Sequence, residues 1–600
     1  MNRAGRRIRA VAGIAATIIA AAFTLAVSSC DVFGGLASPA ASGAPFVRFL
    51  EPVNGEIDLS LYADAAGRSA YVVFTTGDSA RIVPDAEAKA LSSDDRSPPA
   101  AGRDLGEAAT ERIRAIPAMP AGTAASGTAR SALFNSTGAP AGDYPGRTQS
   151  FMVVSNAAGT TLEAFPATCR YASGSAGSGD PMDAVDFGSG RSRTLSIWVA
   201  DNCWDVAPTL KHAVTQEMVD ALAAAFFGTS GAPSASIYAW VTSMLGDEWG
   251  SHGYSNLIAA DGNVTILLAD ISKDNSDTGG IVGYFAPVNA VVGVTASNER
   301  VMFVIDAVMY ANPDDEGDGV GASGYLADAW EQSDYWAETT FSTLAHEFQH
   351  MIHYYQKGVL RGGDYYNQPT WIDELCSMQV EDLLSDKMGV AGPRGVAPGD
   401  WTAGSPGNAA GRLPDFIYFN DISLDDWGGI DIYASYSAAY AFGAYLARNY
   451  GGAEFVRRVV QSADATPGAI AAAAAAFSGR DETAESLLRR WGAAVLLSGR
   501  TDAPEYYRYN TGARFASAGG GVEYSLGSID MHNYRLGIDT NADGAVDSYV
   551  SEPYVYSAAT IRRILGGAYS NAFMGLGDPA SKPGWKLTVP AGMYATIVID

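Results

Sequence analysis

The feature that most constrains this chain is a pair of histidines four residues apart with a glutamate between them, in the stretch His346-Glu347-Phe348-Gln349-His350. We expect this stretch to lie in a helix over 336–355, where positions i and i+4 share one face. Two imidazoles in that arrangement can bind one zinc ion, and Glu347 then lies beside the metal as a general base for water. The chain has only 6 histidines in 600 residues, so a chance match is improbable.

A catalytic zinc site needs a third protein ligand, and Glu374 is the residue we expect to provide it. A segment rich in Gly, Asn and Pro follows the first helix and predicts a turn, after which a helix over 371–384 returns its first turn to the metal. Glu381 lies seven residues further on the same face, where it can accept a hydrogen bond from a zinc-bound histidine. Alternatively, Glu374 is an acid that stabilises a helix N-terminus. The alternative for Glu381 is a solvated acid on the helix surface.

The order of these motifs resembles a known group of enzymes. H-E-x-x-H followed by Trp371-x-x-Glu374 and then Glu381 resembles the gluzincin metallopeptidases. The stretch 297–300, Ser-Asn-Glu-Arg, and the Phe348-Gln349 pair resemble more closely the hyicolysin family of bacterial secreted metallopeptidases. The resemblance covers roughly residues 210–500 and implies a zincin-like fold that cleaves polypeptides. It implies His346, His350 and Glu374 as zinc ligands and Glu347 as the base.

The resemblance also implies a tyrosine that donates to the oxyanion. Tyr440 fits the Tyr-x-x-Gly pattern of aminopeptidase relatives, and Tyr436 is the alternative one turn earlier. Leu375 stands where those relatives have glycine. Their G-x-M-E-N motif, which recognises a free N-terminal amine, is missing here, and the strand expected over 301–305 has no acid to replace it. We therefore expect an endopeptidase that pairs extended substrate along this strand, rather than an aminopeptidase.

The N-terminus has the composition of an export signal. Four arginines precede an apolar run over 10–27, and small residues then lead to Cys30. This pattern resembles a bacterial lipoprotein signal over residues 1–30, with Cys30 as the lipidated residue; an ordinary secretory signal is the alternative. We expect an extracytoplasmic protein held at a membrane by its lipid. A net charge of -27 argues against nucleic acid as a partner.

A chain of 600 residues is too long for a single core, so we expect an α+β multidomain protein. A β-rich N-terminal region spans 31–206 with a linker-like insertion over 86–147. A zinc metallopeptidase domain with a mixed sheet spans 207–500, and a small β-rich region spans 501–600. Further helices are expected over 214–227, 433–449, 453–462, 469–477 and 483–498, and buried strands over 264–270 and 301–306.

Two weaker patterns concern cysteines and calcium. Cys169 and Cys203 bracket a β-rich segment and are expected to form a disulfide in an oxidising compartment, whereas Cys376 is expected to be a small buried residue. The stretch 539–547 resembles the first nine positions of a calcium loop, but Val550 stands where the loop would end in glutamate. An acidic turn without metal is the alternative. The possible calcium ligands are Asp539, Asn541, Asp543 and Asp547.

Taken together, these patterns predict a zinc-dependent endopeptidase of extracytoplasmic polypeptides. The competing hypothesis is a catalytically silent, surface-binding lipoprotein that keeps the metallopeptidase fold. The presence of Glu347 favours the enzyme, since a binding role needs no base. A purely structural zinc site would need a fourth ligand, and no residue is obviously placed to supply it.

Overall fold

The computed structural model describes residues 43–600 apart from several segments, the longest of which are 78–141, 314–328, 398–410, 539–547, 557–566 and 578–585. Three predictions lie outside the described residues: the lipidated Cys30, most of the 86–147 linker, and the four calcium ligands in 539–547. Within the described part of the chain, no helix is both long and apolar enough to cross a bilayer.

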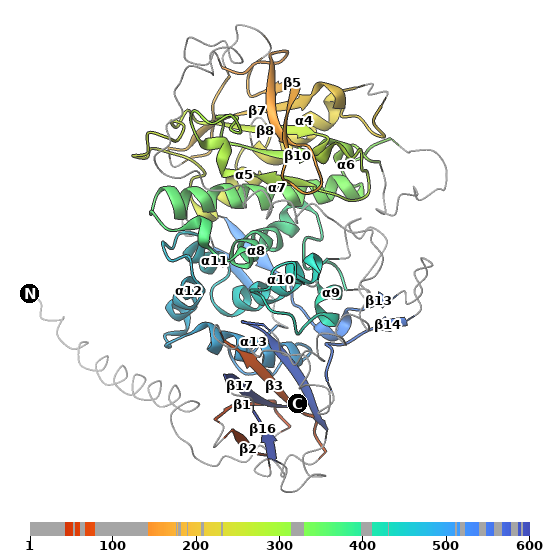
Figure 1. Ribbon diagram of the computed structural model, residues 1–600, viewed down its shortest axis with the longest axis vertical. Helices are drawn as coiled ribbons and strands as arrows, with labels where there is room; N and C mark the ends of the chain where they lie inside the picture. The colour runs from red at the N-terminus through yellow and green to blue at the C-terminus, as the bar shows by residue number, and fades with distance from the viewer. Residues whose placement is uncertain are drawn as a thin grey trace, which may run out of the picture.

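A seven-stranded mixed sheet forms the upper layer of the molecule in Figure 1. β7, β8 and β10 run parallel, and the other pairings are antiparallel. β8 and β10 are buried along almost their whole length, as expected for parallel strands covered on both faces. β9 lies at one edge. The strand order is β4 (Thr148–Val154), β5 (Leu162–Ala172), β7 (Ser192–Ala200), β8 (Asn263–Ala269), β10 (Met302–Asp306) and β9 (Gly283–Phe285), with β6 (Val185–Asp186) beside β7.

Four helices accompany this sheet: α4 (Gln216–Phe227), α5 (Ile237–Leu245), α6 (Ala307–Tyr310) and α7 (Tyr335–His353). The Phe226 ring of α4 packs edge-on against Phe303 of β10 and Phe348 of α7, with centroids 5.5 and 5.1 Å apart. Residues of three elements therefore fix the position of α7, which crosses the middle of the molecule beneath the sheet (Figure 1). α7 continues as a π-helical segment, η5 (Tyr354–Val359).

Below α7 lies a group of helices centred on α8 (Figure 1). Nearly every residue of α8 from Trp371 to Ser385 is buried, which is the pattern of a helix enclosed on all sides. α10 crosses α8 closely at Gly443, where a Cβ atom would lie 2.8 Å from Cγ of Leu375. The helices are α8 (Thr370–Met388), α9 (Leu413–Tyr418), α10 (Ile432–Asn449), α11 (Ala453–Val460), α12 (Gly468–Ser478) and α13 (Ala484–Leu496).

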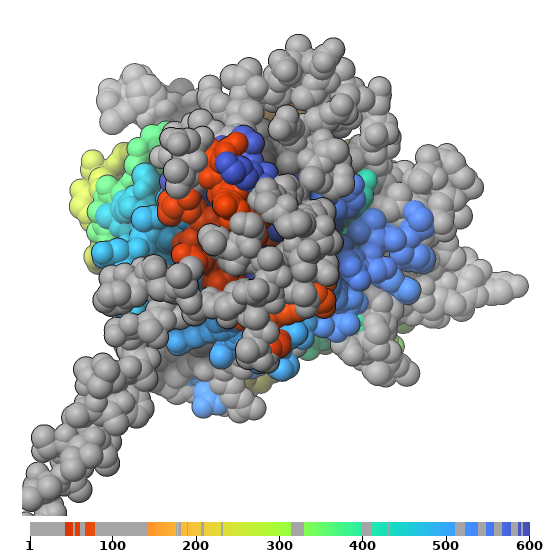
Figure 2. Space-filling view, turned by 90° about the horizontal axis from the view of Figure 1, so that it is seen from below, coloured from red at the N-terminus to blue at the C-terminus, as the bar shows by residue number. Residues whose placement is uncertain are grey.

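The lowest layer is an antiparallel sheet built from both ends of the described chain. Its order is β1 (Phe46–Leu50), β17 (Met593–Ile599), β3 (Ala70–Thr76) and β15 (Asn571–Gly577). Viewed from below, N-terminal and C-terminal segments lie together on this surface (Figure 2). Arg489 of α13 donates to the carbonyl of Ala595, which ties the sheet to the helices above. Three two-stranded sheets pair β2 (Glu56–Asp58) with β16 (Lys586–Thr588), β11 (Ala513–Ala516) with β12 (Glu523–Leu526), and β13 (Leu536–Ile538) with β14 (Ser548–Val550).

The α+β class is confirmed, and the expected helices and buried strands form within a few residues of their predicted ends. The strands expected as one N-terminal β region, however, divide between two sheets. Those before residue 77 pair with C-terminal strands, whereas β4, β5 and β7 belong to the sheet that contains β8 and β10. The strand over 301–305 that was expected to pair with substrate is not an edge strand. It forms β10, which lies between β8 and β9, so β9 is the edge.

The expected disulfide is not formed, because Cys169 and Cys203 are both free and buried. In the ladder between β5 and β7, Cys169 lies opposite Trp198, and Cys203 lies beyond the end of β7 in a 3-10 turn. The two thiols therefore point to different surroundings: Cys169 donates to the carbonyl of Tyr171 and Cys203 to the side chain of Asn202. Cys376 is a buried free thiol, as its predicted role requires.

Candidate metal centre

The H-E-x-x-H residues lie in the C-terminal half of α7, with all three charged or titratable side chains buried. His346 and His350 are one turn apart, and their ring centroids are 4.8 Å from each other. One ligand atom from each of His346, Glu347 and His350 can be chosen so that all lie within 4.8 Å of one another. The helix therefore presents two imidazoles and a carboxylate to one point, as the spacing predicts.

Glu374, in the first turns of α8, reaches the same point. Its Oε2 lies 3.1 Å from Nε2 of His346 and 3.4 Å from Nε2 of His350. Pro369 immediately precedes α8 and sets where the helix begins. The structure thus brings together the three side chains that were expected as metal ligands.

The residues present fit a zinc ion. Two imidazole nitrogens and one carboxylate are a ligand set of catalytic zinc sites, with a fourth position left for water. Oε1 of Glu374 is fully buried and accepts no hydrogen bond from any described residue. A buried carboxylate oxygen without a partner is costly, and a cation at this point would satisfy it.

The titratable groups of this cluster shift one another's pKa values. Burial opposes the charged form of His346, but its hydrogen bonds to Glu374 and Glu381 outweigh burial and raise its pKa well above the usual value. Burial likewise favours the neutral form of Glu374, yet the charge of His350 and the hydrogen bonds from both histidines hold the pKa of this carboxyl well below its usual range. The carboxylate of Glu374 is therefore ionised at neutral pH, as metal binding requires.

Each histidine has a carboxylate on its far side. Nδ1 of His346 donates to Oε1 of Glu381 at 2.7 Å, and Ser342 donates to the other oxygen of Glu381. Nδ1 of His350 lies 3.1 Å from Oδ1 of Asp373. Since a carboxylate can only accept, both rings direct Nε2 toward the shared point. Glu381 occupies the place that its spacing predicts.

Asp373 was not identified from the sequence. It precedes Glu374 by one residue, so a comparison of residues on one helix face passes over it. The same carboxylate also contacts Nδ1 of His353 at 2.6 Å and accepts from the Tyr365 hydroxyl at 2.9 Å. His353 therefore supports the site through Asp373 and is more than a packing residue.

Glu347 is held from the other side by the edge strand. The backbone N–H of Phe285 in β9 donates to Oε2 of Glu347 at 2.7 Å. This contact fixes one carboxylate oxygen and joins the H-E-x-x-H helix to β9. Glu347, the residues expected as metal ligands and the sheet edge are therefore adjacent.

Comparison with known proteins agrees with this arrangement. The family model for peptidase M30 matches residues 188–530, more than half of the chain. The chain belongs to this family. The neutral metalloprotease ShpI of Staphylococcus hyicus is 26% identical over 204 residues, 34% of this chain and 39% of the relative. The chain thus spans about two fifths of that relative's length. The resemblance to the hyicolysin family is confirmed by these two matches.

Tyr440, the expected oxyanion donor, binds a different acid of α8. It is fully buried, and its hydroxyl donates at 2.9 Å to Oδ2 of Asp382, which also accepts from Arg448. Asp382 is eight residues beyond Glu374, about two turns along α8. The expected oxyanion role of Tyr440 is therefore not supported by its position: the tyrosine serves a buried polar network. Tyr436 packs against Trp427, with ring centroids 4.8 Å apart.

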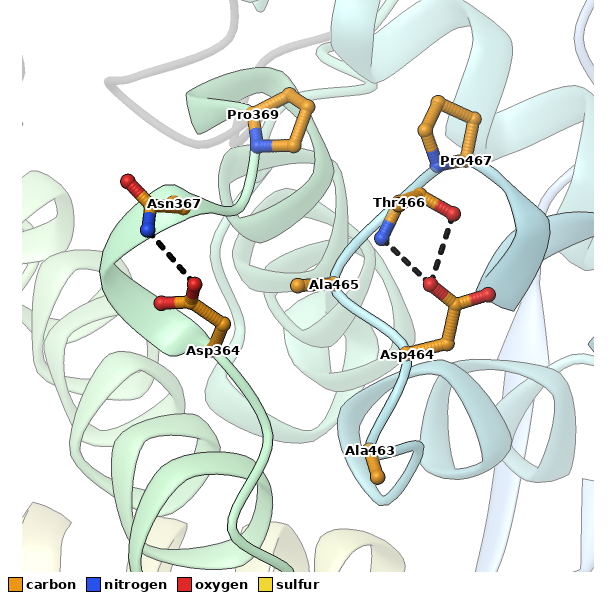
Figure 3. A pocket seen from close by; sticks show the side chains of 8 residues that line it. All are labelled: Asp364, Asn367, Pro369, Ala463, Asp464, Ala465, Thr466 and Pro467. Atoms are coloured by element: carbon orange, nitrogen blue, oxygen red, sulfur yellow. Dashed lines mark hydrogen bonds between the residues drawn. The ribbon is translucent and has the colours of Figure 1, made fainter.

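A pocket of about 420 Å³ opens between the loop that precedes α8 and the loop that follows α11 (Figure 3). Two carboxylates lie on opposite sides of it, Asp364 and Asp464. Asp364 accepts from the amide of Asn367, and Asp464 accepts from the backbone and hydroxyl of Thr466. Both acids are thus engaged by their own loops, and neither belongs to the cluster around His346.

Proposed function

We propose that this M30 protein is a zinc-dependent endopeptidase that hydrolyses polypeptides outside the cytoplasm. The observation that carries the proposal is the convergence of His346, His350 and Glu374 with Glu347 alongside. A bound zinc ion would polarise the scissile carbonyl and lower the pKa of the attacking water. Everything else in the proposed reaction is done by side chains and backbone groups of the chain itself.

Glu347 accepts the proton of the attacking water and returns it to the leaving amine. The N–H of Phe285 holds Oε2, so that Oε1 is the oxygen which exchanges the proton. Among the described strands β9 pairs only with β10, and we propose that an extended peptide adds along its other side. A peptide bound along β9 would lie beside both the base and the ligand cluster.

Endopeptidase activity is favoured over aminopeptidase activity by the missing amine-recognition motif. Peptides with free and acetylated N-termini distinguish the two activities. We expect equal cleavage of both at an internal bond. Release of single residues from free N-termini alone would identify an aminopeptidase instead.

The alternative is a catalytically silent protein that keeps the family fold. It is tested by comparing the wild type with Glu347→Gln, using Glu217→Gln, an exposed acid of α4, as the matched control. We expect one zinc per chain in all three proteins and casein cleavage lost only in Glu347→Gln, by about 1,000-fold or more. Zinc binding without Glu347-dependent cleavage would support the silent alternative.

We also propose that Cys30 is lipidated and anchors the protein to a bacterial membrane. Intact-mass analysis of protein from bacterial membranes tests this, with Cys30→Ser as the variant. A mature chain that begins at an unmodified residue would instead indicate an ordinary secretory signal. Calcium binding by Asp539, Asn541, Asp543 and Asp547 also remains a proposal, tested by calcium-dependent thermal unfolding.

A further inference from the structure

Exposed apolar side chains occur in segments that adjoin β9, the strand whose Phe285 N–H holds Glu347. Eight large apolar side chains of the described residues are more than a third exposed, and three of them, Tyr254, Val292 and Tyr366, belong to segments that adjoin β9 or the end of α7. Tyr254 is 46% exposed and Tyr366 is 48% exposed. An apolar surface next to a proteolytic centre is a place where substrate side chains can bind.

A continuous series of ring contacts connects this surface to Glu347. Phe285, whose N–H holds Glu347, packs against Tyr354 with ring centroids 6.0 Å apart. Tyr354 in turn contacts Tyr366, with centroids 6.1 Å apart. Phe285 and Tyr354 are themselves buried, at 6% and 5% exposure, whereas Tyr366 is exposed.

The loop between α5 and β8, which carries Tyr254, also contacts Tyr354. Trp249 stacks on Tyr354, with centroids 6.3 Å apart, and the indole N–H donates to the carbonyl of Ile258. His252 uses both ring nitrogens within the same loop: Nε2 contacts the Ile258 carbonyl, and Nδ1 accepts from the N–H of Tyr254. Tyr254 is therefore held in place by its own loop before any substrate binds.

The same loop is attached to the segment that follows β9. Residue Leu257 forms a backbone bridge with Val291, and the N–H of Val292 donates to the carbonyl of Asn256. This segment begins two residues after Phe285, at η4 (Pro287–Ala290). The exposed Val292 therefore lies in a segment that is bound to the loop of Tyr254.

We propose that Tyr254, Val292 and Tyr366, with Phe285 and Tyr354 beneath them, form a subsite that selects a large apolar or aromatic side chain of the substrate. The proposal rests on the proposed peptidase function and specifies its substrates. An extended peptide advances about 3.3 to 3.6 Å per residue, so the selected residue lies within about four positions of the scissile bond. The exposed side chains of the proposed subsite are two aromatic rings and a valine, which favour an apolar occupant over a charged one.

Quenched fluorescent peptides that differ only in one residue test the subsite. Each position within four residues of the cleaved bond is changed in turn among Phe, Leu, Ala, Asp and Lys. In the wild type we expect one position at which kcat/KM for Phe or Leu exceeds that for Ala by about tenfold or more. A preference for Lys or Asp at that position, or equal cleavage of the whole series, would overturn the proposal.

Variants then assign the preference to the tyrosines. In Tyr254→Ala/Tyr366→Ala, the preference for Phe over Ala is expected to fall to about threefold or less. The double Phe variant at the same positions keeps both rings and is expected to keep the preference. Tyr549→Ala, which removes an exposed tyrosine from β14, is the matched control.

Two other results would overturn the assignment. An unchanged preference in the double Ala variant would show that other residues select the substrate. A loss of kcat for all peptides alike in Tyr366→Phe would give its hydroxyl a part in the reaction itself. Absence of Glu347-dependent cleavage of every peptide would overturn the proposed function and the subsite together, whereas Glu347-dependent cleavage without an apolar preference would overturn the subsite alone.

Discussion

Oδ1 of Asp373 lies 3.1 Å from Nδ1 of His350, on the side of the ring opposite the metal position. Asp373 and Glu374, the expected ligand, are consecutive residues of α8, so one helix turn contacts both histidines of the candidate site. Glu381 contacts His346 from the same helix. α8 therefore places a carboxylate beside each of the two histidines of α7.

Asp373→Asn should weaken zinc binding by about 10- to 100-fold, because the carboxylate that orients His350 and raises its basicity is lost. Competition with a chromophoric chelator measures the dissociation constant independently of activity. Asp364→Asn, in the loop just before α8, is the control and should bind zinc like the wild type. An unchanged dissociation constant in Asp373→Asn would mean that His350 needs no such support.

Zinc should raise the unfolding temperature of the metal-free protein, because a ligand that binds only the folded state stabilises it by mass action. The effect depends on Glu374, whose buried Oε1 has no hydrogen-bond partner among the described residues. In Glu374→Gln the zinc-induced shift measured by calorimetry should largely disappear. If the shift persisted at the same zinc concentrations, Glu374 would not be a ligand.

Much of the site could be predicted because its residues are related by helical spacing. His346 and His350 share a face, and Glu374 and Glu381 share another, so each helix could be oriented before the fold was known. Asp373 could not be identified from this spacing because it lies on a different face of its helix. The role of Phe285 could not be predicted, since β9 has only three residues and its contribution is a backbone N–H.

The pairing of strands that are far apart in the chain also could not be predicted from the sequence. Strand patterns over 44–206 were recognised, but no local pattern says that β3 pairs with β15 and β17 near the other end of the chain. Tyr440 was misassigned for a similar reason. Several tyrosines share α10, and the sequence does not reveal that this helix places Tyr440 beside Asp382 rather than beside Glu374.

Tyr440→Phe should lower stability and leave the reaction intact. The variant removes a buried hydrogen bond to the carboxylate of Asp382, which costs about 1 to 2 kcal/mol of unfolding free energy. Because the hydroxyl is bound to Asp382, kcat should stay within about twofold of the wild type. A fall in kcat of about 100-fold at unchanged stability would restore Tyr440 as the oxyanion donor.

Asp143→Asn should destabilise the protein in a pH-dependent way. Burial favours the neutral form of Asp143, but the charge and hydrogen bond of Arg300, together with Arg147, outweigh burial and hold the pKa of this carboxyl below its usual value. A depressed folded-state pKa contributes stability above the unfolded value of about 4, and this stability is lost as pH falls through the folded value. The stability difference should therefore be about 2 kcal/mol near pH 7 and shrink below about pH 4.

Urea unfolding of wild type and variant between pH 3 and pH 7 checks this, with the exposed Asp425→Asn as the control. The contact also bears on domain organisation, because Asp143 precedes β4 and Arg300 precedes β10. A chain that begins at residue 207 should consequently fail to fold, since it lacks β4, β5 and β7 as well as this ion pair. Cooperative unfolding of such a chain would show that the peptidase domain is independent of these strands.

Gly443→Ala should destabilise the protein although the position is in a helix interior. There the replacement of glycine ordinarily stabilises by about 1 kcal/mol. At this position the new Cβ would lie 2.8 Å from Cγ of Leu375 and from Nε2 of Gln379, so we expect a loss of about 1 to 3 kcal/mol. Leu375 stands where related peptidases have glycine, and Gly443 provides the space that this leucine needs.

A double-mutant cycle tests whether the two positions compensate each other. Leu375→Ala alone should cost about 2 to 5 kcal/mol through lost packing. In the double variant, the methyl group added at position 443 meets a shortened side chain, so the two effects should couple by about 1 kcal/mol or more. Additive losses in urea unfolding would show that Gln379 alone limits the space at Gly443. Measured coupling would instead explain how this M30 peptidase keeps α8, and with it Glu374, in place without the usual glycine.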